Sequence, residues 1–64
     1  MITDWHSFLR VYDRCIRFGT MTDDDLDAVT AATRVLQPES LALLLLQRME
    51  ARLLELARFG DEDA

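Results

Sequence analysis

The sequence predicts an all-α protein of three helices. Apolar residues recur at spacings of three and four, and no segment alternates with the period of two that marks a half-buried strand. Two interruptions, at Gly19 and at Gln37-Pro38, divide the chain into three helical segments. Because 64 residues leave room for one small core, we expect a single domain over residues 1–64 that ends in a short acidic tail, residues 60–64.

The first helix is predicted over residues 4–18. Thr3 or Asp4 can cap its start, and Gly19 supplies the left-handed residue that commonly ends a helix. Its expected core face consists of the apolar residues at helical spacing, Trp5, Phe8, Leu9, Tyr12, Cys15 and Ile16. The single cysteine lies on that face, so we expect it to act as a small core residue.

The second helix is predicted over residues 22–36. Its start, Thr22-Asp23-Asp24-Asp25, resembles a capping box, and Met21 with Leu26 fits a hydrophobic staple across it. The aspartates also lie where the helix dipole favours negative charge. The expected core face is formed by Leu26, Ala28, Val29, Ala32, Val35 and Leu36.

The third helix is predicted over residues 38–59. Pro38 disfavours helical geometry at Gln37 and suits the first turn of a helix, and Gly60 is expected to end it. At about 100° per residue, one stripe faces the core. Its members are Ala42, Leu45, Leu46, Met49, Leu53, Leu56 and Ala57.

The third helix carries more leucines than that stripe needs. Leu43 and Leu54 lie together just off it, beside Gln47 and Glu50, whereas Leu41 and Leu44 lie on the far side. Two short helices cover one face of a third, not its whole circumference, and contiguous exposed apolar patches usually mark interfaces. We therefore predict a protein interface formed by Leu41, Leu43, Leu44, Gln47, Glu50 and Leu54.

This interface predicts a non-enzymatic interaction module: a small adaptor, co-chaperone or regulator, or a phage-type inhibitor of a host protein. The partner is a second copy, which would give a homodimeric helical bundle, or another protein, because two-fold pairs are the commonest assemblies and small cores often need them. All seven basic residues are arginine, a bias that suits a GC-rich bacterial or phage genome. The start of the chain lacks the pattern of a signal peptide, so we expect a cytoplasmic protein.

The net charge of −5 disfavours general nucleic-acid or anionic-membrane binding. No apolar run exceeds six residues, so no membrane span is expected. Two nucleic-acid-related roles remain as alternatives. Arg10, Arg14 and Arg17 line one side of the first helix and would bind RNA in a dimer, although the same row can dock on the acidic start of the second helix. The other alternative is phosphate mimicry by the aspartates Asp23, Asp24, Asp25 and Asp27.

The sequence predicts neither a metal site nor an active site. As a calcium loop starting at Asp23, the cluster would place Ala28 where glycine is needed and Arg34 where glutamate is needed. His6 and Cys15 lie on different faces of the first helix, and the chain has no second histidine. With no paired acid and base and no glycine-rich phosphate loop, we expect no enzyme and no cofactor.

Overall fold

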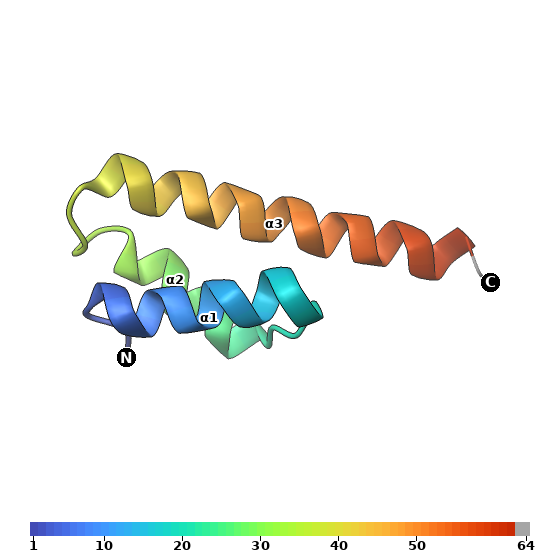
Figure 1. The fold of residues 1–64 in the computed structure, drawn as a ribbon, viewed down its shortest axis with the longest axis horizontal. Coiled ribbons are helices and arrows are strands. Elements are labelled where there is room, and N and C mark those ends of the chain that lie inside the picture. The colour runs from blue at the N-terminus through green and yellow to red at the C-terminus, as the bar shows by residue number, and fades with distance from the viewer. Residues whose placement is uncertain (63–64) are drawn as a thin grey trace.

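The computed structural model describes residues 1–62, which form three helices and confirm the predicted all-α fold. Helix α1 spans Trp5–Phe18, α2 spans Asp23–Ala32 and α3 spans Glu39–Glu62. Helices α1 and α3 point in the same direction, and α2 runs back between their ends (Figure 1). Each helix contacts both of the others, so one core serves all three.

Helix α1 starts one residue later than predicted, with Asp4 as its cap, and ends where predicted. The backbone N–H and the hydroxyl of Ser7 both donate to the carboxylate of Asp4, which caps the helix. Gly19 adopts a left-handed conformation with φ of 66° and donates its N–H to the carbonyl of Cys15. The core prediction for Leu9 is wrong, because this side chain is 45% exposed. Helix α1 packs on two helices at once, so Val11 packs against the core on the side of the helix away from Leu9.

Helix α2 starts with the predicted capping box. The N–H of Asp25 donates to the hydroxyl of Thr22, and the N–H of Thr22 donates back to the Asp25 carboxylate, at 3.1 and 3.4 Å. Both bonds satisfy backbone donors that the first turn of a helix leaves unpaired.

The predicted end of α2 at residue 36 is wrong, because the helix ends at Ala32. The N–H groups of Arg34 and Val35 bond to carbonyls three residues earlier, which winds the chain more tightly than an α-helix. The Thr33 hydroxyl donates to the carbonyl of Thr30, a local bond that competes with regular helix geometry. Val35, predicted as core, is therefore turned outward and is 60% exposed.

Helix α3 starts one residue later and ends three residues later than predicted. Pro38 precedes the helix, and its carbonyl accepts hydrogen bonds from the N–H groups of Leu41 and Ala42. The prediction that Gly60 ends the helix is wrong, because α3 continues through it to Glu62. A glycine permits the left-handed conformation without requiring it, and it costs about 1 kcal/mol inside a helix. Of the predicted acidic tail, residues 60–62 are helical and residues 63–64 lie outside the described residues.

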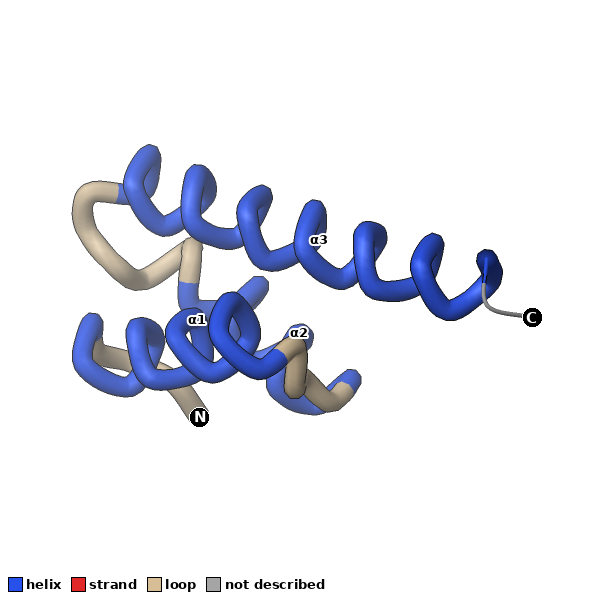
Figure 2. The backbone as a smooth tube through the Cα atoms, turned by 45° about the vertical axis from the view of Figure 1, so that its right-hand side comes forward, coloured by secondary structure: helices blue, strands red, loops and turns tan. Residues whose placement is uncertain are grey.

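The core draws on all three helices and on the turn after α2. Its buried apolar residues are Phe8, Cys15, Val29, Ala32, Leu36, Ala42, Leu46 and Met49. At about 1.5 Å per residue, α3 is longer than α1 by roughly 15 Å, so its last turns extend past the end of α1 (Figure 1). The segment between α2 and α3 passes beside the start of α1 (Figure 2). No helix of the described chain combines the length and the apolar composition that crossing a membrane requires.

Candidate protein-interaction surface

Four leucines of α3 are exposed on a helix whose opposite side forms the core. Leu41 is 43% exposed, Leu43 41%, Leu44 48% and Leu54 66%. On the same helix Ala42 and Met49 are fully buried. Since α1 and α2 both pack on that buried side, neither covers these leucines.

The six predicted interface residues fall into two separate surfaces. Leu43, Gln47, Glu50 and Leu54 follow one another at spacings of four, three and four, so they share one face of α3, which we call the 43–54 stripe. All four are exposed, and Leu54 is the more exposed of the two leucines. Leu41 lies roughly 150° around the helix from the centre of that stripe, and Leu44 lies between the two. The predicted residues therefore do not form one contiguous patch. The 43–54 stripe is the largest set of them that shares one face of the helix.

The opposite flank of α3 is partly occupied by Arg52. Its guanidinium lies 3.6 Å from the carboxylate of Glu55, and its buried Nε has no hydrogen-bond partner among the described residues. Cys15 packs nearby, with its sulfur 3.9 Å from the carbonyl oxygen of Met49. Burial raises the pKa of the Cys15 thiol, and the positive charge of Arg52 opposes that shift. Cys15 is fully buried, as expected of a core residue.

The arginine row of α1 is largely engaged within the chain. Arg14 contacts the carboxylate of Asp25 on α2 at 2.7 Å, and Arg17 contacts Asp13 at 2.9 Å. Among the described side chains Arg10 makes no ion pair within 4.0 Å. Arg14 thus joins α1 to the acidic start of α2, and two of the three candidate phosphate ligands already hold carboxylates.

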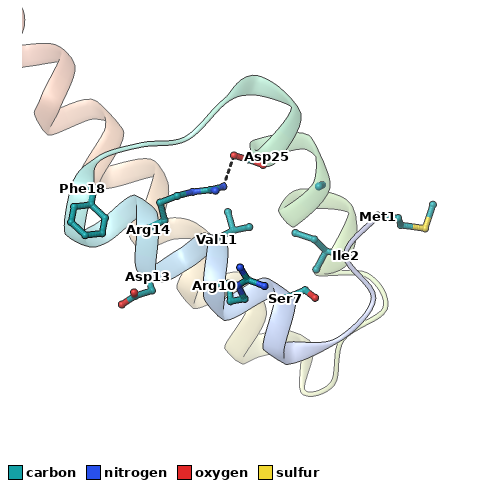
Figure 3. A pocket seen from close by; sticks show the side chains of 10 residues that line it. Met1, Ile2, Ser7, Arg10, Val11, Asp13, Arg14, Phe18 and Asp25 are labelled. Atoms are coloured by element: carbon teal, nitrogen blue, oxygen red, sulfur yellow. Dashed lines mark hydrogen bonds and ion pairs between the residues drawn. The ribbon is translucent and has the colours of Figure 1, made fainter.

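An open hollow of about 620 Å³ lies between α1 and α2 (Figure 3). Arg14 of α1 contacts Asp25 of α2 across this hollow. Its charged lining consists of two arginines and two aspartates, so their formal charges cancel. The lining residues are Met1, Ile2, Ser7, Arg10, Val11, Asp13, Arg14, Phe18, Asp25 and Ala28. This mixed, open surface presents no excess charge to select a charged ligand.

Among the aspartates at the start of α2, Asp25 contacts both the helix cap and α1. Asp25 completes the capping box and binds Arg14, whereas Asp23 and Asp24 make neither contact. Within the described residues, no three or more histidine, cysteine, aspartate or glutamate side chains are grouped as metal ligands would be. No protein-family model, curated protein or solved structure matches this chain.

Four large apolar side chains outside the predicted interface are exposed: Met1, Leu9, Phe18 and Val35. Phe18 is 73% exposed and ends α1, while Leu9 and Val35 were predicted as core. Phe18 directly precedes the capping Gly19, and no role is predicted for it from the sequence. Leu9 and Val35 give no sequence signal for exposure, since each fits the apolar period of its helix.

Proposed function

We propose that the chain is a non-enzymatic protein–protein interaction module that binds its partner through α3. The observation that carries the proposal is the exposure of Leu41, Leu43, Leu44 and Leu54, which ranges from 41% to 66%, on a helix that already supplies its own core face. Leu41 and Leu44 adjoin at a spacing of three, and adjoining exposed apolar side chains are characteristic of docking surfaces.

The magnitude of the apolar effect supports this choice. Complete burial of a leucine side chain stabilises by roughly 1.5–3 kcal/mol relative to full exposure. Since these leucines are about half exposed, burying the remainder would stabilise a complex by part of that amount. A partner would present an apolar groove, with polar groups near Gln47 and Glu50 at the rim. This chemistry suits a small adaptor, a regulator or an inhibitor that covers part of a larger protein.

The nucleic-acid alternatives have weaker support. To contact phosphates, Arg14 and Arg17 would have to leave Asp25 and Asp13, and each released carboxylate would then repel the nucleic acid. Phosphate mimicry would need the aspartates of α2, of which Asp25 is already held by Arg14 and by the capping box.

The test replaces Leu43 and Leu44 together by serine. We expect helicity by circular dichroism to stay near that of the wild type, and capture of the partner by the tagged chain, or the mass of its complex, to fall. The matched control replaces Leu9 and Val35, which have similar exposure but lie outside α3. Equal loss of binding in both variants, or unfolding of the Leu43/Leu44 variant as a monomer, would contradict the proposal.

A further inference from the structure

We propose that the 43–54 stripe of α3 pairs antiparallel with the same stripe of a second copy of the chain. The inference rests on the proposed function and specifies the partner. The pairing places a two-fold axis beside the middle of the stripe, between Arg48 and Met49. It brings Leu43 against Leu54 of the second copy and Gln47 against Glu50 of the second copy.

The spacing of the stripe is symmetric about its centre. The steps from Leu43 to Gln47, to Glu50 and to Leu54 are four, three and four residues, so the stripe has the same spacing in either direction. A two-fold interface requires such self-complementarity, because each contact from one copy must be repeated from the other. Alternating steps of four and three also keep a helix face directed at a neighbouring helix.

The residue types fit this symmetry as well as their positions do. Leucines occupy both ends, so two apolar contacts form, one on each side of the axis. In the middle, the amide N–H groups of Gln47 can donate to the carboxylate of Glu50 from the other copy, and the same bond forms twice. Each carboxylate that the contact covers therefore gains a donor.

Repulsion between the Glu50 carboxylates determines the direction of the two helices. A parallel pair would set each residue against its own copy, and the two Glu50 carboxylates would face each other. Like charges placed directly opposite each other are unfavourable, and no arginine belongs to the stripe. The antiparallel pair separates the carboxylates and gives each one an amide.

The stripe is not occupied by contacts from the described part of its own chain, so it is accessible to a second copy. Leu54 is 66% exposed and Gln47 and Glu50 are exposed. Among the described residues, none of the four side chains makes a hydrogen bond or an ion pair. The core face around Ala42 and Met49 points elsewhere, so pairing requires no opening of the fold.

The first experiment measures the mass of the wild-type chain by sedimentation equilibrium up to about 0.1 mM, where a dimer with a micromolar Kd is nearly complete. We expect a dimer, and we expect replacing Leu43 and Leu54 by serine to raise its Kd by about tenfold or more. Replacing Leu41 and Leu44 by serine is the matched control and should change the dimer Kd much less. A wild-type monomer, or equal effects of the two variants, overturns the pairing.

The second experiment tests whether Gln47 and Glu50 lie in the contact between the two copies by exchanging donor and acceptor. In the antiparallel pair, Gln47→Glu sets two carboxylates together on each side of the axis and should weaken the dimer by about tenfold. Adding Glu50→Gln to that variant should restore the dimer, because each carboxylate again meets an amide from the other copy.

The single substitution Glu50→Gln separates the two directions. In a parallel pair it removes the two facing carboxylates and would strengthen the dimer, whereas in the antiparallel pair it replaces a charge-assisted bond by a neutral one and should weaken the dimer slightly. A tighter dimer of this variant overturns the antiparallel direction. Circular dichroism verifies that each variant is folded.

These outcomes separate the two proposals. A wild-type monomer whose capture of another protein is lost in the Leu43/Leu44 variant overturns self-pairing and leaves the interaction module standing. A dimer that is unaffected by every α3 variant overturns both.

Discussion

The indole Nε1 of Trp5 donates a hydrogen bond of 2.7 Å to the backbone carbonyl of Gln37, 32 positions later in the chain. This bond joins the first residue of α1 to the loop before α3. The ring of Trp5 also meets Phe8 edge-on, with centroids 5.4 Å apart. One side chain therefore connects the start of α1 both to the core and to the start of α3.

Replacing Trp5 by phenylalanine should reduce the free energy of unfolding by about 1 kcal/mol or more, because it removes the N–H donor and leaves the Gln37 carbonyl without this partner. Urea unfolding followed by circular dichroism measures the loss. Tyr12→Phe is the control, since the Tyr12 hydroxyl makes no hydrogen bond among the described residues although its ring packs against the core. Equal effects of the two changes would contradict a role for the indole bond.

Replacing Thr22 by alanine should cost about 1 kcal/mol, because the substitution removes the hydroxyl that accepts from the N–H of Asp25. Thr20→Ala is a matched control two residues earlier, where the side chain is exposed and the residue lies before the helix. Thermal unfolding compares the two. If Thr20→Ala lowers the melting temperature as much as Thr22→Ala does, the capping box contributes nothing specific.

Replacing Gly19 by alanine should destabilise the protein through two separable effects. The left-handed conformation, with φ of 66°, costs an L residue about 1–2 kcal/mol. A Cβ at this position would also lie 2.5 Å from a methyl carbon of Leu56. The double variant Gly19→Ala with Leu56→Ala relieves only the second effect, so denaturant unfolding of the four proteins should give a favourable coupling between the two changes. Strict additivity would exclude the methyl contact as a cause.

The pH dependence of stability should include a contribution from Asp4. The hydroxyl and the backbone N–H of Ser7 bond to its carboxylate and lower its pKa below the ordinary value. The unfolded chain therefore binds the proton first, so the stabilisation is complete above the ordinary pKa of aspartate and is lost as the pH falls through the lower pKa of the folded chain. The stability difference between wild type and Asp4→Asn should thus shrink in acid.

Ser7→Ala tests the cause of that pH dependence. Removing the hydroxyl should move the pKa of Asp4 back towards its ordinary value, and the wild-type excess of stability over this variant should also shrink in acid. Urea unfolding between neutral and acidic pH measures both differences. A difference that does not vary with pH would show that the Ser7 bonds do not distinguish the two charge states of Asp4.

The sequence predicted the features that depend on neighbouring residues. The caps at Asp4, Thr22 and Gly19 all bond to residues three or four positions away along the chain. The end of α2 could not be found this way, because Ala32 is followed by four more residues that fit the apolar pattern or tolerate a helix. The chain winds more tightly after Ala32, and Leu36 packs into the core from the turn that follows α2.

The exposure of the candidate surface could be predicted wherever it follows from the period of α3 alone. The leucines that the helical wheel placed off the core stripe are exposed, since the wheel needs only the direction of the core. The same wheel already separates Leu43 and Leu54 from Leu41 and Leu44. The contact of Arg14 with Asp25 required in addition the crossing of α1 and α2, which spacing along one helix does not give.

The parallel arrangement of α1 and α3 also determines when the protein can fold during its synthesis. Cys15 packs against Met49, 34 positions later, so the first helix waits for its partner until most of the chain has been made. Contacts of such long range form late and slowly compared with those inside a helix. A nascent chain that ends before residue 49 would therefore contain the α1 and α2 sequences but lack Met49, against which Cys15 packs.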